Sequence, residues 1–169
     1  MKEKNKPGTR TLTHVDESGN PGMVDISDKA ITKRNAIAQA IVVPGEEIIH
    51  HLQGDEIMTK KGPVFQTAII AGTMGCKKTS DLIPLCHPLA LEKCKIHIKV
   101  NENKEIIITC TASITSKTGV EMEALTGATV AALTIYDMCK AFSHNIIIKE
   151  IKLLEKTGGK SDYKTIAEL

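Results

Sequence analysis

The sequence has very few aromatic residues: two Tyr, two Phe and no Trp among 169 residues. Proteins that hold single-stranded nucleic acid stack its bases on aromatic rings, and this chain has almost none to offer. Its core must therefore be built from aliphatic residues and Met. The net charge of +2 also lacks the basic excess that is typical of a dedicated nucleic-acid-binding protein. We therefore predict no nucleic-acid partner.

Long apolar runs and paired-cysteine motifs are missing as well. No stretch approaches the roughly 18 apolar residues that a membrane-spanning helix needs, so we predict no membrane partner. The first ten residues are polar and Lys-rich, unlike a secretion signal. The cysteines are odd in number and form no C-x-x-C motif: Cys76, Cys86, Cys94, Cys110 and Cys139. This pattern predicts reduced thiols and a cytoplasmic location.

The composition is that of an ordinary globular domain, with 41% apolar and 25% charged residues. A chain of this length forms one domain by default and buries roughly 70% of its unfolded surface. We place a single domain at residues 12–161. Residues 1–11 are predicted to be a disordered tail, and residues 162–169 a C-terminal tail.

Hydrophobic periodicity predicts an α+β protein. Alternation of apolar and polar residues indicates strands, and long Ala-, Leu- and Met-rich stretches indicate helices. We expect helices at 46–52, 63–79 and 120–142, and strands at 23–26, 93–100, 105–114 and 146–154. Residues 31–43 are ambiguous, because their Ala-rich middle suits a helix while small residues alternate at period two. The order is the ferredoxin-like β-α-β-β-α-β, an antiparallel sheet with helices on one face.

A stiff loop holds a thiol beside an imidazole. Pro84 and Pro88 exclude a regular helix, and His87 precedes a proline, so Cys86 and His87 lie on extended backbone. The pair could bind substrate or transfer protons, or it could be a structural turn. A metal site would need further ligands from His14, His50 or His51, and no supporting spacing exists. We predict no metal site.

The long predicted helix carries carboxylates near both ends. Glu123 and Asp137 are fourteen positions apart and fall within about 40° of one face. Asp137 and Lys140 stand at i and i+3, close enough to pair and to shift each other's pKa. Such a pair transfers protons in a pocket, whereas on a solvated face it is a weak surface ion pair.

Several cationic loops could hold an anionic small molecule. Lys60-Lys61-Gly62 precedes a predicted helix, and Gly158-Gly159-Lys160-Ser161 lies near the C-terminus. Neither matches the spacing of a P-loop. Arg34 adds another cation, so the chain can offset several phosphate charges.

Five segments together resemble the signature blocks of one family. They are MVDIS at 23–27, KG at 61–62, TSDLIPLCHPL at 79–89, KTGVEMEALT at 117–126 and YDMCKA at 136–141. In this order and spacing they resemble the MoaC family, the cyclic pyranopterin monophosphate synthases of molybdenum-cofactor biosynthesis. The similarity runs from about Leu12 to Ser161. The resemblance implies a ferredoxin-like subunit in a homo-hexamer, a trimer of dimers with active sites at dimer interfaces.

The activity that the resemblance implies is that of a lyase. It would convert 3′,8-cyclo-7,8-dihydro-GTP, a cyclised GTP derivative, to cyclic pyranopterin monophosphate and release pyrophosphate. No cofactor is implied, apart from Mg²⁺ that could accompany the triphosphate. The matching catalytic positions are Asp137, Lys61 and Lys140. The matching substrate-binding positions are Leu85, Cys86, His87, Met122, Glu123, Glu121, Arg34 and Lys160.

Three positions depart from the family pattern, and one of them is Asp162, where a glycine is expected after Ser161 and on which the placement of Lys160 depends. Pro63 stands where Asp is common, and Lys78 stands where Arg is usual, so bidentate geometry is lost there. Two other functions fit the same residues. One is a non-catalytic nucleotide- or pterin-binding module, and the other is a metal-dependent hydrolase that uses Cys86 and His87.

Overall fold

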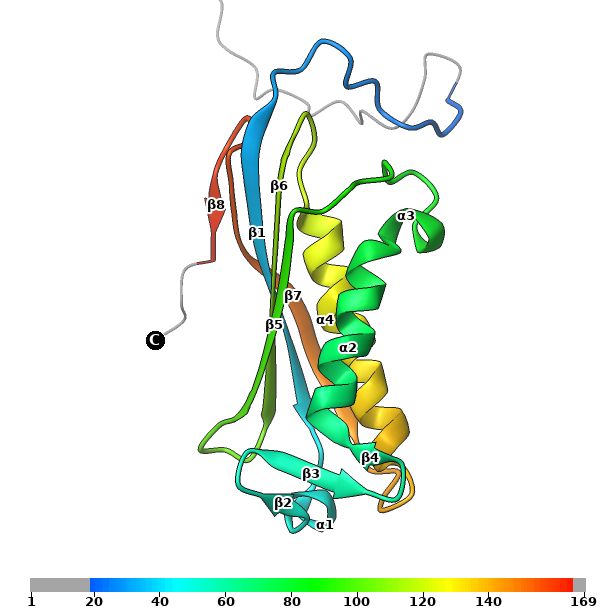
Figure 1. Ribbon diagram of the computed structural model, residues 1–169, viewed down its shortest axis with the longest axis vertical. Coiled ribbons are helices and arrows are strands. Elements are labelled where there is room, and N and C mark those ends of the chain that lie inside the picture. The colour runs from blue at the N-terminus through cyan, green and yellow to red at the C-terminus, as the bar shows by residue number, and fades with distance from the viewer. Residues whose placement is uncertain (1–18, 166–169) are drawn as a thin grey trace, which may run out of the picture.

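A computed structural model describes residues 19–165 and has the predicted α+β architecture (Figure 1). Its principal elements follow the order β-α-β-β-α-β: β1 (Thr32–Val43), α2 (Val64–Lys77), β5 (Lys93–Val100), β6 (Ile106–Ser116), α4 (Glu121–Cys139) and β7 (Ile147–Thr157). The main sheet has the order β5-β6-β1-β7-β8, where β8 is Tyr163–Lys164. Every pairing in this sheet is antiparallel. The fold-class prediction is confirmed.

Strand β1 occupies the centre of the sheet and resolves the ambiguity over residues 31–43. Ala36, Ala38, Ala40 and Val42 are fully buried, and the residues between them are half-buried. Burial at every second position is the period of a strand and not of a helix. Pairing with β6 on one side and β7 on the other satisfies the backbone of β1 along its length. Tertiary pairing therefore overrides the helix propensity of the alanines.

Helices α2 and α4 pack side by side on one face of the sheet (Figure 1). Gly72 makes this close approach possible, because a Cβ there would stand 2.7 Å from the Gly127 carbonyl oxygen and 2.4 Å from the Ile96 side chain. Small residues at a helix crossing bring backbones together, and a larger side chain would force them apart. Between these helices and the sheet lies the aliphatic core that the scarcity of aromatics predicts.

A second, smaller sheet lies at the end of the molecule where α2 begins (Figure 1). It comprises β2 (Leu52–Gln53), β3 (Glu56–Thr59) and β4 (Gly62–Pro63), preceded by α1 (Glu46–Ile49). Glu56 of β3 caps α2: its carboxylate accepts the backbone N–H groups of Phe65 and Gln66 at 2.7 and 3.1 Å. These groups at a helix start have no partner within the helix. Pro63 is the N-cap residue, so its missing N–H leaves α2 intact.

Some predicted elements differ from those observed. The strand predicted at 23–26 is wrong: this segment is irregular, and the Asp25 carboxylate accepts the backbone N–H and the hydroxyl of Ser27. Such local bonding competes with strand pairing. The helix predicted at 46–52 ends at Ile49, and the small sheet that follows was not predicted. Residues assigned to a C-terminal tail form β8 against β7.

The long connection from α2 to β5 carries the stiff loop. Helix α3 (Thr79–Leu82) opens this connection, and residues 83–92 form no regular element. Prolines 84 and 88 account for the irregular backbone, as the sequence predicts. Within residues 19–165, no helix is both long and apolar enough to cross a bilayer.

Candidate active site

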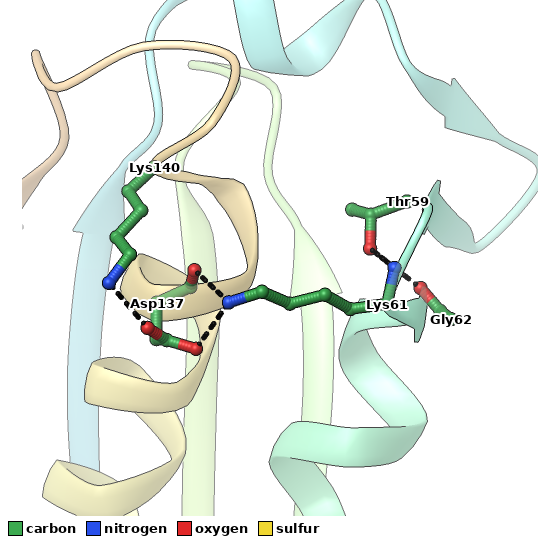
Figure 2. A network of polar contacts seen from close by, with 5 residues as sticks. All are labelled: Thr59, Lys61, Gly62, Asp137 and Lys140. Atoms are coloured by element: carbon green, nitrogen blue, oxygen red, sulfur yellow. Dashed lines mark hydrogen bonds and ion pairs between the residues drawn. The ribbon is translucent and has the colours of Figure 1, made fainter.

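Asp137 lies at the end of α4 between two lysines (Figure 2). Lys140 contacts Oδ1 of Asp137 at 2.8 Å, which confirms the predicted i, i+3 pair. Lys61 Nζ donates to Oδ2 at 2.8 Å and to the Asp137 carbonyl oxygen at 3.1 Å. The Asp137 and Lys140 side chains are 55% and 48% exposed, so this is a solvated cluster.

The β3–β4 turn positions Lys61. The Thr59 hydroxyl accepts the backbone N–H of Lys61 at 3.0 Å and donates to the Gly62 carbonyl oxygen at 3.1 Å (Figure 2). Gly62 has φ of 111°, a left-handed conformation that favours glycine. The Glu56 carboxylate, on the same hairpin, accepts the backbone N–H of Phe65 and so links the turn to the start of α2. The sequence placed Lys61 near a helix start but did not predict its carboxylate partner.

The two lysines strongly favour the ionised carboxylate. Hydrogen bonds from Lys140 and Lys61, reinforced by their charges, lower the pKa of Asp137 to about 2. The same pairing raises the pKa of Lys140. At neutral pH the cluster therefore holds one carboxylate and two ammonium groups, with a net positive charge.

A second group of predicted residues lies at the other end of α4, in a cavity of about 490 Å³. Leu85, Cys86 and His87 line it from the loop, and Glu121, Met122 and Glu123 line it from the start of α4. His87 is fixed by its Nε2, which donates to the Val24 carbonyl oxygen at 2.9 Å. The loop and the segment 23–26 are thus tied together at this cavity.

Burial raises the pKa of two groups that line this cavity. Glu123 is only 4% exposed, and its desolvation, helped by Glu121, raises the pKa of its carboxyl. Burial, and then Glu123, raise the pKa of the Cys86 thiol, so this thiol stays protonated. Lys156 of β7 pairs with Glu121 at 3.1 Å. A neutral thiol and a carboxyl with raised pKa suit hydrogen bonding to a heterocycle.

A second cavity, of about 640 Å³, adjoins the first and is lined by four cationic side chains and by the carboxylates of Asp25 and Asp28. Both are lined by Lys29, Thr118 and Gly119. Arg34 and Lys160, both predicted, line the second cavity with Lys117. Arg34 donates to the Lys117 carbonyl oxygen at 3.3 Å, and its buried Nε has no hydrogen-bond partner within residues 19–165. This cavity can accept an anion.

The structure separates the predicted site residues into two groups. Asp137, Lys61 and Lys140 lie at the C-terminal end of α4, and all the other predicted residues lie toward its N-terminal end. Fourteen residues of α-helix separate Glu123 from Asp137, a rise of about 21 Å. The shared helix face therefore does not bring these carboxylates together within one chain.

Three lysines in the cavities were missed by the sequence reasoning: Lys29, Lys117 and Lys156. Lys117 belongs to the KTGVEMEALT block and could have been found there. Lys29 and Lys156 carry no local signal, because the fold alone brings them to the cavity. Among residues 19–165, Cys86 and His87 belong to no cluster of three metal-ligating side chains. His14, the other ligand considered, lies outside the described residues.

Comparison with known proteins identifies the family. The MoaC family model matches residues 23–159. The chain belongs to the MoaC family. A cyclic pyranopterin monophosphate synthase of Xanthomonas axonopodis pv. citri is 50% identical over 151 residues, covering 89% of this chain and 92% of that protein. A synthase of the same name from Xanthomonas campestris pv. campestris is 48% identical over 157 residues, covering 93% and 95%.

Longer MoaC-family relatives also match. The molybdenum cofactor biosynthesis bifunctional protein of Synechocystis sp. is 57% identical over 155 residues, which cover 89% of this chain. The chain spans 45% of that relative and 28% of molybdenum cofactor biosynthesis protein 1 of Dictyostelium discoideum, to which it is 49% identical. In these relatives the MoaC-like region is one part of a longer protein.

Proposed function

We propose that this chain is a cyclic pyranopterin monophosphate synthase, which converts 3′,8-cyclo-7,8-dihydro-GTP to cyclic pyranopterin monophosphate and pyrophosphate. The observation that carries the proposal is the match, over nearly the full length of both chains, to relatives named for this activity. The site supports it, because ring closure and cyclic-phosphate formation need proton transfer and cations that offset the departing pyrophosphate.

The substrate fits two adjoining cavities. The heterocycle enters the cavity of Cys86, His87 and Glu123, where hydrogen bonds replace the aromatic stacking that this chain cannot provide. The triphosphate extends into the cavity of Arg34 and Lys160, where the unpartnered Nε of Arg34 gains an acceptor. The protein needs no resident cofactor for this role, and Mg²⁺ can accompany the triphosphate.

The catalytic group reaches this substrate from a second subunit. A separation of about 21 Å along α4 is too large for Asp137 to act on a ligand beside Glu123 of its own chain. The outer faces of α2 and α4 carry exposed apolar side chains, among them Ile70, Met74 and Leu133, which are 62%, 54% and 54% exposed. Exposed apolar patches are typical of interfaces. We therefore place the sites at the dimer interfaces of a homo-hexamer, a trimer of dimers.

Assembly and substrate binding prepare Asp137 for proton transfer. A carboxyl with a pKa of about 2 is a weak base at neutral pH, and efficient acid–base groups titrate nearer the working pH. Phosphate oxygens compete with Asp137 for Lys61 and Lys140, and the partner subunit excludes water. Both changes remove stabilisation of the ionised form, so the pKa of Asp137 rises when substrate is bound.

The activity is tested by incubating the protein with the cyclised dihydro-GTP and measuring pyrophosphate and the cyclic pterin product. We expect both products in equal amounts, and unchanged turnover when the protein is treated with a chelator before Mg²⁺-containing substrate is added. A protein that binds the nucleotide but releases no pyrophosphate would be a binding module, and the proposal would be wrong.

The five cysteines are free, which supports a reducing, cytoplasmic location.

A further inference from the structure

Three cysteine side chains meet between α2 and the sheet. They are Cys76 of α2, Cys94 of β5 and Cys110 of β6, and their sulfur atoms all lie within 4.8 Å of one another. The sequence has no C-x-x-C motif that would indicate this cluster, because each sulfur comes from a different element. The cluster lines neither of the cavities assigned to the substrate.

The fold leaves room for these sulfurs. A Cβ at Gly127 of α4 would stand 2.7 Å from Cys110 Sγ and 3.3 Å from Cys76 Cβ, so only glycine leaves both undisturbed. On the sheet, Cys94 is opposite Ala112, and Cys110 is opposite Ile96. Cys94 and Cys110 are therefore diagonal neighbours on the face that the helices cover.

The separation of the sulfurs suits a shared ion. Zinc–thiolate bonds are about 2.3 Å long, so thiolates around one ion lie roughly 3.8–4.0 Å apart. The observed cluster needs a contraction of at most about 1 Å to reach that geometry. A disulfide between the diagonal pair is less suitable, since Cα atoms about 7–8 Å apart exceed the range that a disulfide spans.

We propose that Cys76, Cys94 and Cys110 bind one thiophilic d¹⁰ cation, Cu⁺ or Zn²⁺, through three thiolates. Each thiol releases its proton to solvent as its sulfur binds the ion, so full binding releases up to three protons. Thiolate ligands select these ions over Mg²⁺ and Ca²⁺, which prefer oxygen. The bound ion would crosslink α2 to two strands and stabilise the fold.

An ion can enter from the side of Cys94. Cys76 and Cys110 are 1% and 0% exposed, whereas Cys94 is only half-buried. Strand β5 is the edge strand of the sheet, beside α2 (Figure 1). The two buried sulfurs form the floor of the site, and Cys94 completes it at the entrance.

Binding is tested with the reduced full chain under anaerobic conditions. Zn²⁺ and Cu⁺ are each supplied from a chromophoric chelator, and the metal transferred per protein is measured. We expect one equivalent of at least one ion, and a loss of affinity of about 100-fold or more in Cys94→Ser, since even indirect changes at metal sites cost 10–100-fold. Cys139→Ala is the matched control, a buried cysteine outside the cluster, and should bind as the wild type does.

Equal binding by wild type and Cys94→Ser, or no stoichiometric binding of either ion, would overturn the proposal and leave three thiols that only fill space. Loss of binding in Cys139→Ala would overturn it too. Cys94→Ser changes the most exposed of the three and is expected to fold. Thermal unfolding provides an independent readout: the ion should raise the Tm of the wild type and of Cys139→Ala, but not that of Cys94→Ser.

Discussion

At the scale of single residues, we propose the Asp137 carboxylate as the reaction centre although its ion pairs lie on the surface. As a stabilising interaction it contributes little, because exposed pairs are screened by water. Two lysines from different elements nevertheless converge on one carboxylate at 2.8 Å each. In the proposed reaction this arrangement places the carboxylate, which accepts a proton once substrate is bound, beside two groups that can bind phosphate.

Asp137→Asn keeps the shape of the side chain but removes the proton acceptor. We expect turnover to fall by about 10²–10⁴-fold, the range for loss of a general acid–base group. The affinity for substrate should stay within a few-fold, because the cavities that bind it are unchanged. Single-turnover kinetics and calorimetric binding would separate the two effects. Glu46→Gln, which breaks the equally short and exposed pair with Lys104, should leave turnover unchanged. A near-normal rate in Asp137→Asn would remove this residue from the mechanism.

Glu123 illustrates a conflict between stability and function. Burial raises the pKa of its carboxyl above 4.5, so the folded state holds the proton more tightly than the unfolded state. Stability therefore falls as the pH rises from 4.5 through the raised pKa. Glu123→Gln removes a carboxyl whose ionised form is disfavoured by burial, and at pH 7 we expect a gain of about 1 kcal/mol, or roughly 2–4 °C in Tm. Calorimetry below pH 4 should show no difference. A lower Tm of Glu123→Gln than of the wild type at pH 7 would contradict the prediction. A loss of substrate affinity in this variant is expected and would not contradict it.

The sequence could predict site residues only where their signal is local. The Asp137–Lys140 pair follows from helical spacing, and the stiff loop follows from its prolines. By contrast, the contact between Lys61 and Asp137 joins residues 76 positions apart. The three-cysteine cluster likewise draws one residue from each of three elements. Such contacts depend on how the elements pack, and one sequence does not specify that directly.

At the scale of elements, predictability follows length except in β1, a 12-residue strand whose Ala-rich middle also suits a helix. The long strands β5, β6 and β7 and the long helices α2 and α4 were all predicted, because many residues repeat one period. Strands β2 and β4 have two residues each, too few for alternation to be visible. Their sheet is held instead by its turns and by Glu56, whose hydrogen bonds tie the hairpin to α2.

Glu56→Gln tests this capping contact. The amide keeps one acceptor but loses the charge that favours the helix N-terminus, so we expect a loss of about 1 kcal/mol, or roughly 2–4 °C in Tm. Because the same hairpin carries Lys61, turnover should also fall several-fold. Glu47→Gln is the control, an exposed glutamate in the first turn of the four-residue helix α1. Thermal unfolding and turnover are measured on both variants. An unchanged Tm in Glu56→Gln would show that the helix start does not need this cap.

At the scale of the whole molecule, the proposed reaction needs both groups of site residues, which lie at opposite ends of α4. In a closed symmetric dimer the same surfaces of both subunits form the interface, so the Asp137 group of each subunit can lie beside the cavities of the other. Each dimer then has two complete sites. The apolar outer faces of the helices offer a surface for such contacts. If the sites are composite, activity depends on the assembly, and two differently inactivated chains can restore each other.

Co-expression of Asp137→Asn with Glu123→Ala tests the shared site. Each variant alone should be nearly inactive, because Asp137→Asn lacks the proton acceptor and Glu123→Ala lacks a binding group of the cavity proposed to hold the heterocycle. In a mixed oligomer, one site can combine the intact Asp137 of one chain with the intact Glu123 of another. Random pairing of equal amounts then restores about a quarter of the wild-type sites. Pyrophosphate release is measured on differently tagged, doubly purified oligomers, with sedimentation to determine their size. Activity no greater than the sum of the separate variants would mean that each chain works alone, and the interfacial site would be wrong.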